Sequence, residues 1–67
     1  MLLRDYLHQR HLTQTEFADL VGVSRPACSY WLSGRNRPSP ASTKTIESVT
    51  RGDVTAADLQ RGWEIEQ

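Results

Sequence analysis

The sequence predicts an all-α domain in which five short helices surround one core. Three observations support this prediction. Apolar residues recur three and four positions apart, capping residues precede the periodic segments, and the connections are only a few residues long. A short strand near Val54 or Ile65, at the C-terminal end, is the one alternative left open beside this helical pattern.

Length and cysteine content limit the classes of protein to be considered. The 67 residues form a single domain, and a chain of this size buries only about 60% of the surface that its unfolded form exposes. Cys28 is the only cysteine, so packing rather than disulfides must hold the fold, and we expect a reducing cytoplasmic setting. No apolar stretch is long enough for a signal peptide or a membrane span, so we expect no membrane association.

The first predicted helix lies at the N-terminal end. Leu3, Tyr6 and Leu7 stand at helical spacing, and Leu3 and Leu7 fall one above the other on the same face. Polar residues at positions 9–11 end this segment.

The second predicted helix has a clear start signal. Thr13 can cap the free amides and Glu16 can reach back to the Thr13 amide, while Leu12 can pack on Phe17. This combination is a capping box with a hydrophobic staple. Its inward face is predicted to hold Phe17, Leu20 and Val21. Gly22 ends the helix, because glycine most easily adopts the left-handed conformation of a sharp helix end.

A third helix is predicted immediately afterwards. Ser24 is its N-cap, Pro26 occupies the first turn, and Val23 can pack on Cys28. The inward side is predicted to hold Cys28, Trp31 and Leu32. The outward side is predicted to hold Arg25, Pro26, Ser29, Tyr30 and Ser33. Gly34 ends the helix.

A basic loop at 35–38 leads to the fourth predicted helix. Ser39 is its N-cap and Pro40 its first residue, Ile46 and Val49 point inward, and Gly52 terminates it.

The same start signal predicts a short fifth helix. Thr55 is its cap, Asp58 takes the capping-box position, and Val54 can pack on Leu59. We expect residues 60–67 to form a C-terminal tail. Trp63 in this tail either covers the core against the first helix or anchors a dimer, and we favour the core.

Two helices joined by a tight turn, with polar and basic residues at the start of the second, are typical of a helix-turn-helix. Helical hairpins are common, so this arrangement alone also fits two helices that merely pack together. The residues at 14–34 go further, because they resemble the helix-turn-helix of the Cro and repressor family. The resembling features are Gln14, Ala18, Gly22, Val23 and the closing sequence Trp31-Leu32-x-Gly34.

The resemblance extends over nearly the whole chain. Segments 35–40, 54–55 and 58–61 are similar to the short Cro-like regulators of YdaS type from phages and prophages. Two departures stand out: Arg25-Pro26 replaces a pair that is frequently polar, and Cys28 replaces an aliphatic residue. The first departure affects which operator sequence is bound, and the second affects the packing of the core.

This resemblance implies a sequence-specific DNA-binding transcription regulator, a Cro-type repressor that needs no cofactor. It would act in the cytoplasm of a bacterial host, on the nucleoid. Its partner would be a double-stranded operator with two half-sites about one helical turn apart, bound by a homodimer that is weak in solution and strengthened on DNA. The resemblance also implies phosphate contacts at the start of the second helix, by Gln14 with the neighbouring Thr15.

The formal net charge of zero conceals an uneven distribution. Residues 20–46 contain four basic residues and no acid, residues 1–19 sum to minus one, and residues 47–67 sum to minus three. The positive stretch includes the third helix and the loop after it, where phosphates would lie. We therefore expect weak, salt-sensitive non-specific binding.

Four residues of the third helix are candidates for contacts with base edges. Arg25 and Tyr30 come first, because an arginine at the start of a helix in the major groove can donate two hydrogen bonds to guanine. Ser29 and Pro26 follow. Pro26 offers only apolar contact, for example to a thymine methyl group, and is better explained as a helix-starting residue.

Further backbone contacts are expected from the basic loop and the helix after it. The candidates are Arg35, Asn36, Arg37 and Lys44. For Arg37 and Lys44, the sequence fits a solvated surface position as well as it fits a phosphate contact.

The sequence predicts neither a metal site nor a catalytic one. His8 and His11 lie three apart without a third ligand at suitable spacing, and Cys28 stands in the apolar register without a neighbouring base. An enzyme is therefore the least favoured class. Two rivals remain: an antitoxin-like regulator whose acidic C-terminal region binds a protein partner, and an interaction module that does not bind DNA.

Overall fold

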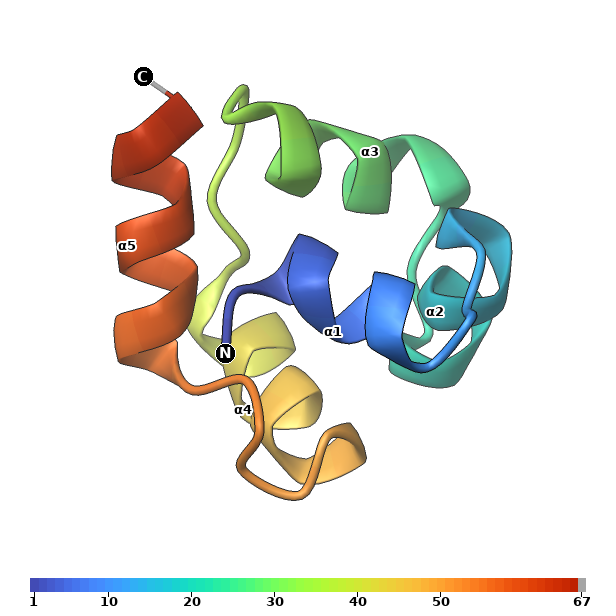
Figure 1. Ribbon diagram of the computed structural model, residues 1–67. Helices are drawn as coiled ribbons and strands as arrows, with labels where there is room; N and C mark the ends of the chain where they lie inside the picture. Colours follow the sequence, from blue (N-terminus) through green and yellow to red (C-terminus); the bar gives the residue numbers. More distant parts are fainter. Residues whose placement is uncertain (67) are drawn as a thin grey trace.

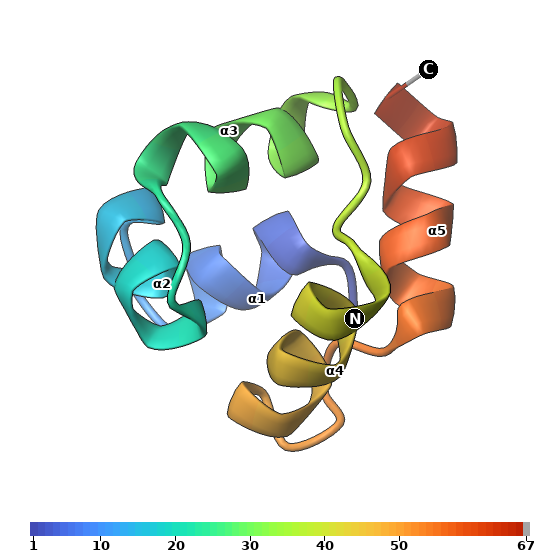
Figure 2. The ribbon, with the colours of Figure 1, turned by 180° about the vertical axis from the view of Figure 1, so that it is seen from behind.

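Five helices follow one another in the computed structural model, which describes residues 1–66. They are α1 (Leu3–Gln9), α2 (Gln14–Val21), α3 (Arg25–Ser33), α4 (Pro40–Val49) and α5 (Ala56–Glu66). Figures 1 and 2 show α1 in the middle of the molecule, with the other four helices arranged around it. The predicted all-α fold class is confirmed.

The core is assembled from all five helices and the turn before α5. Its buried members are Leu3, Tyr6, Leu7, Phe17, Ala18, Cys28, Ile46, Val54 and Leu59. The rings of Tyr6 and Phe17 meet edge to face, with centroids 6.2 Å apart and planes at 65°. This contact joins α1 to α2. The burial of each large apolar side chain contributes about 1.5–3 kcal/mol to the stability of the folded state.

The predicted helix starts are confirmed at the level of single hydrogen bonds. Thr13 Oγ1 accepts from the Glu16 amide at 3.1 Å, and Glu16 Oε1 accepts from the Thr13 amide at 3.0 Å, which completes the capping box. Ser24 Oγ accepts from the Ala27 amide at 3.4 Å and Ser39 Oγ from the Ser42 amide at 3.1 Å. These bonds satisfy amides that have no intrahelical acceptor.

The inward position predicted for Leu20 is wrong, because this side chain is 55% exposed. At about 100° per residue, the buried face of α2 runs from Phe17 through Val21 to Ala18. Leu20 falls beyond Phe17, outside this face.

The end of α4 and its connection to α5 differ from the sequence prediction. The C-cap of α4 is Thr50, so the helix ends before Gly52, which takes a left-handed φ of 83° in the following turn. Thr50 is only 2% exposed, and its hydroxyl donates to the Ile46 carbonyl at 2.7 Å and accepts from the Val54 amide at 3.1 Å. One side chain thereby bridges the end of α4 and the segment that leads into α5.

The short strand allowed for near Val54 or Ile65 is wrong for the described residues, because Ile65 lies in α5, a single helix from Ala56 to Glu66, and Val54 lies in the turn before it. This helix also covers most of the range expected to form a tail, and residue 67 lies outside the described residues. The predicted capping box is present: Thr55 Oγ1 accepts from the Asp58 amide at 3.2 Å and Asp58 Oδ2 from the Thr55 amide at 3.1 Å. The Met1 ammonium also donates to Asp58 Oδ2, at 2.8 Å.

Candidate nucleic-acid interface

The turn between α2 and α3 is built from three residues, Gly22 to Ser24. Gly22 has a left-handed φ of 85°, and the amides of Gly22 and Val23 both donate to the Ala18 carbonyl, at 2.8 and 2.9 Å. Ala18 itself is 1% exposed, so a small side chain lies on the inward side of α2. These bonds end α2 sharply, and the Ser24 cap starts α3 at once.

The outward face of α3 gathers the residues expected to contact bases. Arg25, Pro26, Tyr30 and Ser33 are exposed and Ser29 is half-buried, whereas Cys28 on the opposite side is fully buried. In Figure 1, α3 crosses the top of the molecule, with its start next to α2 and its end next to the loop that leads to α4. Arg25 occupies the first turn of this helix and makes no ion pair with any residue in 1–65.

Tyr30 and Arg35 form a pair at the far end of α3. The Arg35 guanidinium carbon lies 5.5 Å from the centroid of the Tyr30 ring, in a cation–π arrangement. The amides of Arg35 and Asn36 both donate to the Tyr30 carbonyl, at 3.0 and 3.4 Å. The backbone reversal at Gly34, with φ 79°, brings the loop back over the helix end. The sequence did not lead us to predict this pair. A helix end at Gly34, with an aromatic residue before it and a basic residue after it, could have indicated the contact.

The start of α2 offers backbone donors for a phosphate. Gln14 is half-buried and Thr15 exposed, and as the first two helical residues they have amides without an intrahelical acceptor. Glu16 carries the only negative charge in this first turn, and its carboxylate is already engaged by the Thr13 amide.

Arg37 and Lys44 lie apart from the outward face of α3. The Arg37 guanidinium carbon lies 4.9 Å from the centroid of the Trp63 ring, and the guanidinium donates to Gln60 Oε1. Lys44 is exposed on α4, where it and Arg37 border a groove that runs between α4 and α5.

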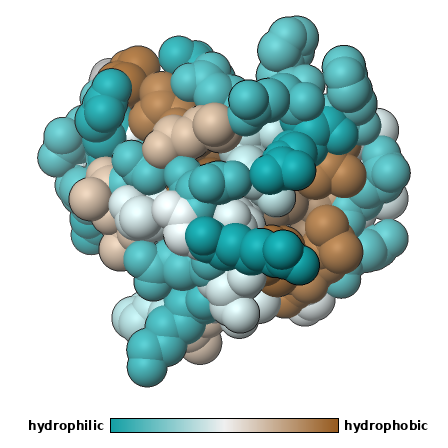
Figure 3. All heavy atoms as spheres, turned by 60° about the horizontal axis from the view of Figure 1, so that its bottom comes forward, coloured by the Kyte–Doolittle hydropathy of each residue, from teal (hydrophilic) through white to brown (hydrophobic). Residues whose placement is uncertain are grey.

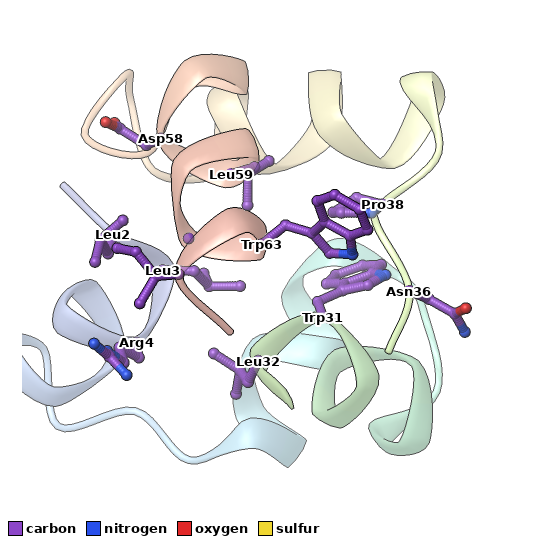
Figure 4. A pocket seen from close by; sticks show the side chains of 12 residues that line it. Leu2, Leu3, Arg4, Trp31, Leu32, Asn36, Pro38, Asp58, Leu59 and Trp63 are labelled. Carbon is purple, nitrogen blue, oxygen red and sulfur yellow. The ribbon is translucent and has the colours of Figure 1, made fainter. Parts of the chain in front are cut away.

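An apolar pocket lies where the start of α1, the end of α3 and α5 meet. Trp31 and Leu32 of α3, Leu59 and Trp63 of α5, and Leu2 before α1 are among the residues that line it. Figure 4 shows the indole rings of Trp31 and Trp63 close together, with Pro38 of the loop beside them. Trp63 is therefore half-buried against α3 and the loop rather than part of the central core.

The remaining surface is mainly polar where Figure 3 displays it. The face seen from the side of α4 is mostly hydrophilic, and its apolar areas are small and separate. No helix within residues 1–66 is long and apolar enough to span a membrane. In the same part of the chain, His8 and His11 are both exposed, and no three side chains of the metal-binding types lie together.

Cys28 lies behind the outward face of α3 as a buried free thiol. Burial raises the pKa of this thiol above its ordinary value of 9.0, because the thiolate loses its hydration. The thiol therefore packs as a small apolar side chain and is a poor nucleophile.

Comparison with known proteins returned one match. A family model described as helix-turn-helix matches residues 3–56, from the first residue of α1 to the first residue of α5. No curated protein and no solved structure gives a significant match. The matched range includes the two helices and the turn described above, together with the loop after α3.

Proposed function

Since the chain belongs to the helix-turn-helix family, whose members are DNA-binding regulatory domains, we propose that it is a sequence-specific transcription regulator that reads its operator through α3. The single observation that carries this proposal is the outward face of α3, where polar and basic side chains are exposed and acids are absent. A helix that merely packs in a hairpin also exposes polar side chains, but it has no need to exclude acidic ones.

The proposed base contacts come from the first two turns of α3. Arg25 donates two hydrogen bonds to guanine, and Tyr30 and Ser29 reach neighbouring bases. Pro26 starts the helix and offers at most an apolar contact to a thymine methyl group. Because Arg25 has no acidic partner among the described residues, its guanidinium is available to DNA without first breaking an ion pair.

The proposed backbone contacts lie on both sides of this helix. Gln14 and Thr15 present side chains and free amides at the start of α2, and Arg35 and Asn36 follow the end of α3. Lys44 on α4 adds a long-range positive charge. With so few cations, binding to random DNA is weak, and its affinity falls with salt concentration by a slope of only about 0.9 per neutralised phosphate.

We further propose a Cro-type repressor of phage or prophage origin, close to the YdaS-type regulators and acting on the nucleoid in the bacterial cytoplasm. One copy of α3 reaches only a few base pairs, so specificity requires two copies on a two-fold symmetric operator. The half-sites would lie about 34–36 Å apart along the DNA. The homodimer is weak in solution and completed on DNA.

Selection of bound sequences from a random DNA pool tests this proposal. The expected result is an enriched pair of inverted half-sites spaced by about one helical turn, with a guanine at the position nearest Arg25. The same selection with Arg25→Ala is expected to lose preference at that position alone. An unenriched pool from the folded wild type contradicts the proposal.

A second candidate function is an antitoxin-like regulator that also binds a protein. The observation in its favour is the acidic C-terminal part of the chain, where the exposed Glu64 stands beside Ile65, which is 53% exposed. A small neighbouring reading frame with a toxic product, bound by this chain and released by Ile65→Asp, would favour it. A module without DNA binding is the poorer reading, because α3 carries no acid and no bulky apolar patch on its outward face.

A further inference from the structure

The side chain of Arg37 is held by α5 through two contacts. Its guanidinium lies over the Trp63 ring at 4.9 Å and donates a hydrogen bond to Gln60 Oε1. Gln60 is fixed in turn, because its amide nitrogen donates to Glu64 Oε1 at 2.9 Å. An arginine of the loop is thereby attached to two side chains, and through Gln60 to a third, on a helix that begins 19 residues later in the sequence.

These contacts compete with DNA for the guanidinium. A phosphate that approached Arg37 would displace Gln60 or meet the carboxylate of Glu64, which repels it. By contrast, Arg35 is stacked on Tyr30 at the end of α3, with no acid among its contacts. The two arginines of the loop are thus in different situations, although they are only two residues apart.

The loop between α3 and α4 has few other attachments at its middle. The amides of Arg35 and Asn36 are bonded to Tyr30 at one end, and Ser39 caps α4 at the other. Between these points, Pro38 lines the apolar pocket together with Trp31 and Trp63 (Figure 4). Arg37 therefore supplies the polar attachment of this part of the loop to α5.

We propose that Arg37 is a positioning residue for DNA binding: it fastens the loop to α5 through Trp63 and Gln60 and holds Arg35 and Asn36 at the end of α3, without contacting a phosphate itself. This inference rests on the proposed function. It replaces the backbone contact expected for Arg37 from the sequence.

The salt dependence of operator binding separates positioning from phosphate contact. A side chain that neutralises a phosphate contributes about 0.9 to the slope of log affinity against log salt concentration, whereas a positioning residue contributes nothing to it. We expect Arg37→Ala and Gln60→Ala each to lower operator affinity about fivefold, with the wild-type slope retained. The double variant is expected to lose little more than either single one, because both remove the same attachment. Arg61→Ala removes the same charge from an exposed position of α5 and serves as the control, with affinity close to wild type.

The free protein gives a second readout that does not depend on DNA. In nuclear magnetic resonance spectra, Arg37→Ala and Gln60→Ala should both shift the Trp63 indole signal and the amide signals of Arg35 and Asn36, while Arg61→Ala leaves them in place. Arg37→Ala with a slope reduced by about 0.9, or with wild-type affinity, overturns the inference and leaves the proposed function intact. Wild-type protein that binds its selected operator no better than random DNA overturns the proposed function, and this inference with it.

Discussion

Single side chains of the loop after α3 make contacts that their sequence positions do not reveal. Arg35 and Arg37 both appear as basic residues of one loop, yet one is stacked on Tyr30 and the other on Trp63. The second contact spans 26 residues of sequence, and no local pattern predicts such a pairing. The inward position of Cys28, by contrast, follows directly from helical spacing.

Thr50 is the residue whose hydroxyl contributes most clearly to stability. Replacing it with valine removes the acceptor for the Val54 amide, which is buried at this position. We expect Thr50→Val to lower the free energy of unfolding by about 1–3 kcal/mol, because the amide is left without a partner. Thermal or urea denaturation followed by circular dichroism measures the loss.

Thr45→Val is the matched control for this prediction. The hydroxyl of Thr45 donates to the Ala41 carbonyl at 3.1 Å on the same helix, but no backbone amide depends on it. Its replacement should change stability by only a few tenths of a kcal/mol. Equal losses in the two variants would contradict the role assigned to Thr50.

Among the features of the helices, those with a local sequence signal could be predicted. The starts of α2, α3 and α4 each depend on a capping residue and the amide three positions later, and all three are formed as predicted. The length of α5 could not be predicted, because Gly62 interrupts its pattern and Trp63 finds its partners on α3 and the loop. Tertiary packing therefore contributes much of the stability of the helix at these residues.

The turn between α2 and α3 depends on the left-handed conformation of Gly22. A Cβ at this position would meet no atom within 4 Å, so the cost of Gly22→Ala is backbone strain alone, about 1 kcal/mol in the free energy of unfolding. Gly22→Asn should cost less, since asparagine tolerates this conformation better. Denaturation midpoints of the two variants measure the difference.

Gly62→Ala should have the opposite effect on the free energy of unfolding. Gly62 lies inside α5, and an added Cβ would be 3.5 Å from Leu2 Cδ2, an ordinary contact. We therefore expect this substitution to stabilise the protein by about 0.5–1 kcal/mol. A loss at Gly62 or a gain at Gly22 would contradict the conformations described.

Asp58, at the start of α5, makes the stability of the folded state depend on pH in the acidic range. The Met1 ammonium and the Thr55 amide lower the pKa of Asp58 below its ordinary value of 3.8. The folded state therefore favours the carboxylate, and this contribution is complete above the unfolded pKa and is lost as pH falls through the folded one. Melting temperatures measured from pH 6 down to pH 2 should fall more in the wild type than in Asp58→Asn. Parallel curves would contradict this role for Asp58.

For the whole molecule, charge and family membership lead to the same surface. The chain is neutral overall, yet its basic stretch without acids runs from the end of α2 through α3 and into α4, within the range matched by the helix-turn-helix family model. The part of the chain that forms the proposed interface could be predicted from this charge distribution together with the capping pattern. Which cations face DNA and which are held by the protein could not, because that depends on where α5 lies.

We propose above all that α3 reads bases through Arg25. The most direct test of this proposal is the fluorescence anisotropy of a selected operator and of a scrambled duplex at one fixed salt concentration, titrated with wild type, Arg25→Ala and Arg61→Ala. We expect wild type and Arg61→Ala to bind the operator at least about 1,000-fold more tightly than the scrambled duplex. Arg25→Ala should weaken operator binding by about 1–3 kcal/mol and scrambled binding far less. Equal affinity of the wild type for both duplexes, or an operator affinity unchanged by Arg25→Ala, would contradict it.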